Sequence, residues 1–261
     1  MRFPLFIAAC LVPAVLCAQP ADSAASPPKV QDNSFLVEEA YNQEAGVVQH
    51  IGTFMKRRGS HDFESGFAQE WPLRSIKHQL SYDIPIVRIG SSTGIGDVAL
   101  NYRYQLRGDG DARVAITPRL SAFLPTGDWK SSRGSGSFGS EAAIALSYVP
   151  SNKLAFHSNA AAALFPKVRD LSDDPRRMHE FAIAQSAIFT GSRIIQPLLE
   201  SVYTSGSEGE EFLLSPGFRA AINFASGLQI VPGIAVPVGI GPSSGSRGVF
   251  AYLSIEHPFK R

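Results

Sequence analysis

Hydrophobic and polar residues alternate along the segment from Asp97 to Leu106. Valine, leucine and tyrosine occupy its even positions, whereas aspartate, alanine, asparagine, arginine and glutamine occupy the odd ones. Because successive side chains of a β-strand point to opposite faces of a sheet, this segment predicts a strand with one apolar and one polar face. Similar alternation recurs from residue 60 to the end of the chain. Repeated after a secretion signal, it is typical of a closed barrel whose apolar face meets lipid.

Clusters of Gly, Ser, Asp and Pro separate the alternating segments and mark turns between them. We therefore predict an all-β fold, a transmembrane antiparallel β-barrel of about 12 strands, the even number usual for single-chain bacterial barrels. The predicted strands are 47–56, 61–72, 77–88, 96–107, 112–124, 138–149, 153–165, 178–190, 193–204, 211–224, 227–238 and 247–259.

Charged residues avoid the apolar faces of several of these strands, clearest in 77–88, 112–124 and 211–224. In 112–124, Val114, Ile116 and Leu120 share one face, and Arg113 and Arg119 lie on the other. A charge on a lipid-facing position is costly near the middle of a bilayer, so this separation favours a membrane barrel. The last strand, 247–259, has the aromatic end that is usual for the closing strand of such barrels, although two basic residues follow it.

The first residues have the pattern of a secretory signal peptide. Arg2 precedes an apolar run that ends near residue 18, and polar, small residues follow. We predict a signal peptide over 1–18, with cleavage between 17 and 25, a leader over 19–46 and the barrel over 47–261. Cys17 could be a lipidated cysteine, but Leu16 occupies the position where a lipoprotein signal needs a small residue.

Composition narrows the class of protein further. Both cysteines, Cys10 and Cys17, lie in the predicted signal, so we expect no disulfide, thiolate metal site or cysteine nucleophile in the mature chain. The formal net charge is +1, which gives no basic field for nucleic acid. No later segment has the ~18 consecutive apolar residues of a membrane helix.

The segment from Ser34 to Gly46 has mixed periodicity, and two structures remain open for it: a short helix or a segment inserted into the barrel. Its acidic residues, with Phe35, Leu36 and Tyr41, could dock in the lumen against arginines as a plug. A surface helix or periplasmic tail is the alternative. Two connections, Thr126–Ser137 and Lys167–Arg177, are longer than turns.

Short motifs give little support for catalysis or cofactor binding. Gly94–Ala99 fits the dinucleotide pattern G-x-G-x-x-A, but alternating residues follow it where a helix would be needed. His157 and Ser158 are adjacent on a predicted strand, so they point to opposite faces and cannot act as base and nucleophile. The histidines include no H-x-H or H-x-x-x-H pair. We expect no cofactor, no metal and no enzymatic activity.

Alternation also predicts which polar side chains point into the lumen. Charges of both signs occur there, which fits either a lattice of ion pairs or a polar constriction that orients a passing solute. The candidate lumen-lining residues are Glu70, Asp97, Asn101, Arg103, Arg113, Arg119, Glu141, Glu200, Arg219 and Glu256, joined by Gln105 and Asn223.

Several segments resemble a known family. The residues Asn33–Glu44 and Gly46–Ile51 look like its N-terminal signature, and His78–Tyr82, Gly94–Tyr104 and Pro118–Asp128 extend the likeness. The family is described as transporters of the meta (MetA) pathway of phenol degradation. The resemblance covers most of the mature chain and implies an outer-membrane barrel that forms a channel for small solutes, aromatic ones among them.

We therefore predict a passive outer-membrane channel for small, aromatic or hydrophobic solutes, exported in a Gram-negative bacterium by a cleaved signal peptide. The alternative is a structural outer-membrane barrel with a closed lumen and no transport. The expected partners are outer-membrane lipid, the barrel-assembly machinery during insertion and a small-molecule solute, with no nucleic acid.

Overall fold

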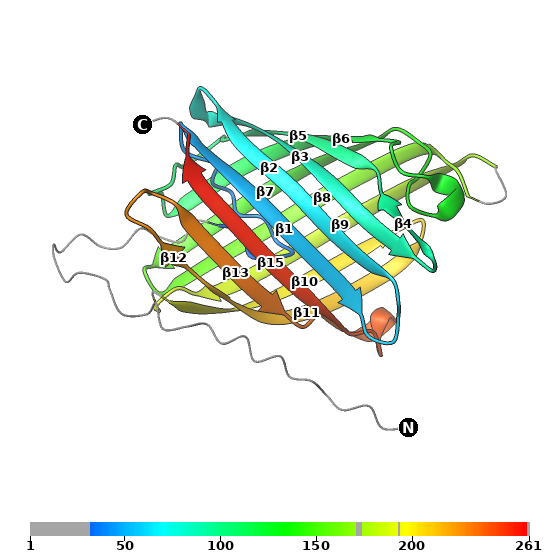
Figure 1. Ribbon diagram of the computed structural model, residues 1–261. Helices are drawn as coiled ribbons and strands as arrows, with labels where there is room; N and C mark the ends of the chain where they lie inside the picture. Colours follow the sequence, from blue (N-terminus) through cyan, green and yellow to red (C-terminus); the bar gives the residue numbers. More distant parts are fainter. Residues whose placement is uncertain (1–31, 171–173, 193, 260–261) are drawn as a thin grey trace.

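The strands of the chain form one closed antiparallel barrel (Figure 1). The computed structural model describes residues 32–170, 174–192 and 194–259, so the predicted signal peptide lies outside the described residues. Within these ranges the strands are β1 (Val47–Arg57), β2 (Phe63–Leu73), β3 (Ser75–Ile89), β4 (Ser92–Ile95), β5 (Val98–Tyr104), β6 (Val114–Leu124), β7 (Gly139–Ser151), β8 (Leu154–Val168), β9 (Arg176–Phe189), β10 (Ile195–Gly206), β11 (Gly209–Ala220), β12 (Ile222–Asn223), β13 (Gln229–Ala235), β14 (Val238–Gly239) and β15 (Gly248–Pro258).

The barrel wall has twelve strands in the part of the chain that the structure describes, as predicted. Three short segments do not add to the wall: β4 folds back on β3, β12 continues β11, and β14 continues β13. Each strand pairs antiparallel with the next, and β15 closes the barrel on β1 with a register from Val47 opposite Pro258 to Arg57 opposite Gly248. No helix among the described residues is long and apolar enough to cross a bilayer.

The outer face of the wall is apolar and the inner face is polar. On β6, Leu120 is 62% exposed on the outside, whereas Thr117 on the opposite face is fully buried inside. Gln79 on β3 and Arg219 on β11 are likewise buried in the interior. This arrangement, inverted relative to a soluble protein, is typical of a transmembrane barrel.

The predicted strand bounds need correction in three places. β5 begins at Val98, because residues 92–95 pair back on β3, and Asp97 therefore precedes the strand rather than belonging to it. The predicted strand 211–224 is interrupted at Ala221, and 227–238 is interrupted at Val236–Pro237. Proline has no N–H to donate to a ladder, which explains the second interruption.

The longest predicted loop, between β6 and β7, contains the short 3-10 helix η1 (Trp129–Ser131). Asp128 caps it by accepting hydrogen bonds from the Ser131 hydroxyl (2.5 Å) and the Lys130 amide (3.2 Å), and these bonds lower the pKa of Asp128. The other predicted long connection, Lys167–Arg177, is shorter than expected, since β8 continues to Val168 and β9 begins at Arg176. A second 3-10 helix, η2 (Gly241–Ser243), precedes β15.

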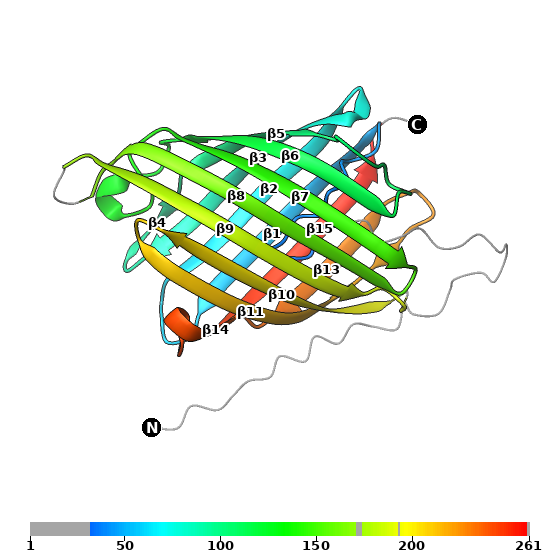
Figure 2. The ribbon, with the colours of Figure 1, turned by 180° about the vertical axis from the view of Figure 1, so that it is seen from behind.

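Residues 32–46 run inside the barrel without forming regular secondary structure, so of the two structures left open for this segment the structure has the inserted segment and not the helix. The segment is visible through the wall as the dark blue chain in both views (Figures 1 and 2). We call it the N-terminal segment. Its contacts with the inner faces of the strands define the candidate site.

Candidate functional site

Glu200 on β10 holds the beginning of the N-terminal segment. Its Oε1 atom accepts hydrogen bonds from the backbone amides of Phe35 (2.8 Å), Leu36 (2.8 Å) and Val37 (3.2 Å). Consecutive amides that converge on one oxygen form an anion-binding concavity of the peptide backbone. Glu200 is fully buried, so the segment is bound here by a carboxylate that water does not reach in this conformation.

Polar side chains of the next strands pair with the backbone of the segment in the way that a neighbouring strand would. Asn159 on β8 accepts from the amide of Glu38 (2.7 Å) and donates to its carbonyl (2.9 Å). The amide of Ala40 donates to Ser147 on β7 (2.7 Å), and its carbonyl accepts from Thr117 on β6 (2.6 Å). Each backbone group of these two residues thus has a partner on the wall, which a buried irregular segment requires.

The amide side chains of Gln105 and Gln79 continue this pattern. Gln105 accepts from the amide of Asn42 (2.8 Å) and donates to the carbonyl of Ala40 (2.7 Å). Gln79 on β3 accepts from the amide of Gln43 (2.7 Å). The segment therefore crosses the lumen, bound in turn to strands on different sides of the barrel.

Two buried arginines bind carbonyl groups of the segment. Arg219 on β11 donates from Nη1 to the carbonyls of Asp32 (2.7 Å) and Asn33 (2.8 Å). Arg103 on β5 donates to the carbonyl of Glu39 (2.5 Å). Because charge-assisted hydrogen bonds are about twice as strong as neutral ones, these three hydrogen bonds are strong anchors of the segment.

Arg119 on β6 lies between two carboxylates. It forms ion pairs with Glu38 of the N-terminal segment and, at 2.5 Å, with Glu141 on β7. The first pair joins the segment to the wall through side chains, and the second is the kind of wall-to-wall ion pair that the lattice interpretation expected.

An aromatic side chain of the segment fills the opposite side of the lumen. The ring of Phe35 packs on Tyr252 and Phe250 of β15, with centroid separations of 5.2 and 5.8 Å. Gly233 on β13 and Gly217 on β11 leave the room for this ring, since a Cβ atom at either position would overlap it. A close approach of this kind is one reason for glycine within a strand.

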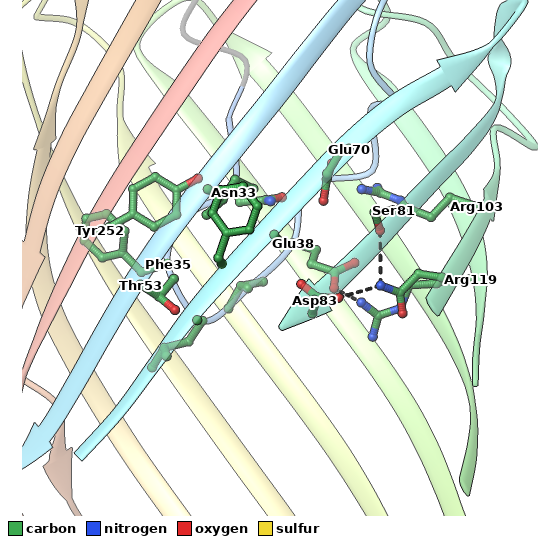
Figure 3. Close-up of a pocket in the computed structure, with 17 residues that line it drawn as sticks. Asn33, Phe35, Glu38, Thr53, Glu70, Ser81, Asp83, Arg103, Arg119 and Tyr252 are labelled. Atoms are coloured by element: carbon green, nitrogen blue, oxygen red, sulfur yellow. Dashed lines mark hydrogen bonds and ion pairs between the residues drawn. The ribbon is translucent and has the colours of Figure 1, made fainter. Parts of the chain in front are cut away.

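A cavity of about 200 Å³ lies beside the segment in the lumen. Figure 3 shows its two unlike sides: Phe35 and Tyr252 form one, and Glu38, Asp83 and Arg119 lie on the other. The cavity is thus lined by aromatic rings on one side and by charges of both signs on the other, so it suits a small molecule with an apolar body and a polar group.

Most of the candidate lumen-lining residues lie at the segment or the cavity. Those in contact with the segment or lining the cavity are Glu70, Asn101, Arg103, Gln105, Arg119, Glu200 and Arg219. Glu141 joins them through Arg119. Within this group, Glu70 accepts a hydrogen bond from Gln79 (2.7 Å), and Asn101 donates to Asp83 (2.5 Å).

The remaining candidates lie elsewhere. Asp97 binds the β6–β7 loop by accepting hydrogen bonds from the amides of Gly127 (2.9 Å) and Ser135 (2.7 Å). Arg113 is exposed just before β6, and Glu256 is partly buried on β15.

Several neutral residues that bind the segment were not among the candidate lumen-lining residues, because mainly charged side chains were selected. In each strand, every second residue points into the barrel, and this alternation was the signal that could have found them. The residues at such inward positions are Gln79, Thr117, Ser147 and Asn159. Asp32 was also missed. It accepts hydrogen bonds from Tyr252 (2.5 Å) and from the side chain of Gln49 (2.8 Å).

His157 and Ser158 do not form a catalytic pair. His157 is buried inside the barrel and shares a hydrogen bond with Ser147 (2.7 Å), whereas Ser158 binds Gln185 (3.0 Å) on the other face. Ser147 in turn accepts the Ala40 amide, so this serine and histidine hold the N-terminal segment.

Comparison with known proteins shows the barrel fold and gives no information on the solute. No protein-family model matches the sequence, and no curated protein matches it. Among solved structures, an outer-membrane channel from Pseudomonas putida F1 is similar with a TM-score of 0.61 and 11% identity, over 84% of this chain and 97% of that chain. The NanC porin is similar with a TM-score of 0.56 and 11% identity, over 82% of this chain and 100% of that one. At such identities the likeness shows a shared barrel fold.

Proposed function

We propose that this protein is a passive outer-membrane channel for small solutes. The observation that carries the proposal is the closed barrel with an apolar outer face and a polar interior that contains a cavity. In a soluble protein, so large an exposed apolar surface would promote aggregation, whereas in a bilayer it is the contact surface for lipid. The two similar solved structures, one described as a porin and one as an outer-membrane channel, agree with this role.

The proposed location is the outer membrane, and the apolar outer face of the barrel supports it. Lipid contacts the outer face, the barrel-assembly machinery inserts the chain, and a signal peptide over 1–18, which lies outside the described residues, directs export. We recognise no energy-coupling motif in the sequence, so solutes are proposed to move down their gradients.

The proposed solutes are small aromatic or hydrophobic molecules that carry a polar group. The unlike sides of the cavity support this class, since an aromatic body can pack on Phe35 and Tyr252 while a hydroxyl or amine meets the charged side. The resemblance of residues 33–128 to the phenol-degradation transporter family also supports it, although no family model matches the chain.

The N-terminal segment is proposed to act as a plug that narrows the channel. Its support is the series of hydrogen bonds from its backbone to the inner faces of β10, β8, β7, β6, β5 and β3. A solute can pass only beside this segment or after part of it has moved.

The alternative is a structural barrel whose lumen stays closed. The same dense bonding of the N-terminal segment favours it, because every anchored residue adds to the free energy needed to open the path. The two functions differ in one measurable property, the passage of ions and solutes.

The test is conductance of the purified protein in planar lipid bilayers, followed by swelling of liposomes in phenolic and in sugar solutes. A channel of the proposed class gives discrete conductance steps and faster swelling with phenolic solutes than with sugars of similar size. A folded, heat-modifiable barrel that is silent in both assays contradicts the channel and supports the structural alternative.

A further inference from the structure

The seam where the barrel closes carries two histidines side by side. His50 lies on β1 and His257 on β15, and in the register of this pair His257 is opposite Val48 while His50 is opposite Ile255. The two histidines are therefore diagonal neighbours on one face of the sheet, close enough for their side chains to meet. That face is the outer one, because Leu253, four residues before His257 and therefore on the same face of β15, is exposed. Their separation of 207 residues hides the pair from any search for short histidine motifs.

The distance between the two rings suits a metal ion. The Nε2 atoms are 3.3 Å apart, and the ring centroids are 5.4 Å apart. A tetrahedral zinc ion has Zn–N bonds of about 2.0–2.1 Å, so two of its nitrogen ligands lie roughly 3.3–3.4 Å apart. An ion between the two Nε2 atoms would therefore need little change in their separation.

The surroundings of His257 prepare its Nε2 atom to bind a metal. The Nδ1 atom lies 3.3 Å from the carbonyl oxygen of Pro258, so it carries the proton and donates it to that oxygen. This leaves the lone pair on Nε2. Metal-binding histidines commonly donate their second ring N–H to a carbonyl in this way. His50 stacks on Phe67 of β2, with centroids 6.2 Å apart, which restrains its ring as well.

We propose that His50 and His257 bind a divalent transition-metal ion, with zinc the expected occupant. Both residues coordinate through Nε2. The proton that His50 donates to His257 in the empty pair moves to Nδ1 of His50 when the metal binds, so both imidazoles remain neutral. His50 is the fourth residue of β1 and His257 the next to last of β15, so the pair lies at one end of the wall, where water borders the lipid. Among the described residues, no group of three or more metal-binding side chains forms, so this water completes the coordination.

A metal at this place would tie the first strand of the barrel to the last. The amide of Phe259, next to this site, donates to the carbonyl of Gly46 (2.7 Å), so the seam also adjoins the end of the N-terminal segment. Because an ion that binds only the folded seam stabilises the folded barrel, zinc should raise its unfolding temperature.

The experiment is zinc titration of the folded, tag-free, chelator-treated barrel in detergent, measured by calorimetry and by the temperature of heat-modifiable unfolding. The proposal predicts saturable binding of one ion per chain and a higher unfolding temperature. His50→Asn and His257→Asn should each weaken binding at least tenfold and abolish the temperature shift. His78→Asn is the matched control, since His78 is another strand histidine that instead hydrogen bonds to Tyr102 (2.7 Å).

Cobalt gives a second readout that does not depend on how well a variant folds. Its visible absorption in the wild-type barrel should show a histidine-bound ion, and this band should disappear in the two seam variants but remain in the control. The proposal is overturned if the wild-type barrel binds no zinc saturably. It is equally overturned if both seam variants bind zinc as the wild type does, because the ion would then occupy another site.

Discussion

Replacing Glu200 by alanine should release the beginning of the N-terminal segment from the wall. The change removes the one oxygen that accepts the amides of Phe35, Leu36 and Val37 at 2.8, 2.8 and 3.2 Å. Among the described residues, no other side chain accepts a hydrogen bond from these three amides, so the docked segment would hold two buried donors and one partly buried donor without a partner.

The size of the effect follows from those three donors. A buried donor left without an acceptor costs about 1–3 kcal/mol. Water that enters the space vacated by the carboxylate satisfies part of the loss, so we take the lower value for each amide, or about 3 kcal/mol in total. A change of this size shifts the ratio of docked to undocked segment by roughly 100-fold.

Thiol labelling measures that ratio directly. The mature chain is expected to have no cysteine, so Val37→Cys, at a position 1% exposed, reacts with a maleimide only when the segment undocks. The labelling rate should rise roughly 100-fold when Glu200→Ala is added. Glu180→Ala on β9, which removes another inward carboxylate, should leave the rate unchanged. Equal rates with and without Glu200 would refute the argument that this carboxylate anchors the segment.

Three further perturbations test other parts of the account. Gly233→Val should displace the Phe35 ring and increase proteolytic cleavage of the N-terminal segment. Gly52→Ala, whose new methyl group meets only an ordinary contact at 3.8 Å, should not, and equal cleavage of the two variants contradicts the packing argument. Leu120→Arg places a charge on the outer face near the middle of β6 and should lower the unfolding free energy in lipid by about 2–4 kcal/mol, seen as a lower urea midpoint; an unchanged midpoint argues against lipid contact there. Arg219→Met leaves two carbonyls of the segment without their donor and should make the chain before β1 sensitive to limited proteolysis, and a resistant variant would show that other contacts suffice.

The barrel could be predicted from the sequence because alternation is a strong signal when one face meets lipid. In β6, the outward Val114, Ile116 and Leu120 and the inward Thr117 and Arg119 follow one period over the whole strand. A shift of one residue would place arginine in lipid, so the register is fixed by the cost of burying charge. The predictions failed locally where this constraint ends, as at Asp97, which lies beyond the strand and binds a loop.

The path of the N-terminal segment could not be predicted. Its backbone follows no period, because its groups are satisfied by side chains from strands that are far apart in the sequence, such as Glu200 and Asn159. The sequence showed acidic residues and inward arginines, which suggested docking. It could not show that most anchors would be bonds from wall side chains to backbone amides and carbonyls, in which the identity of the segment's own residues matters little.

The two histidines at the seam illustrate the same limit. Spacing in the chain indicated no metal site, since the pair becomes adjacent only when β15 closes on β1. Barrel closure is a property of the whole fold, and residues that meet across it share no local pattern.

The central claim is that the barrel is a channel narrowed by its own N-terminal segment. Single-channel conductance of the full-length protein and of a variant lacking residues 33–45, both reconstituted in planar bilayers after their heat-modifiable folding has been verified, tests it most directly. The account predicts that the deletion raises the conductance and the fraction of time spent open. A correctly folded deletion variant with unchanged or absent conductance would contradict it.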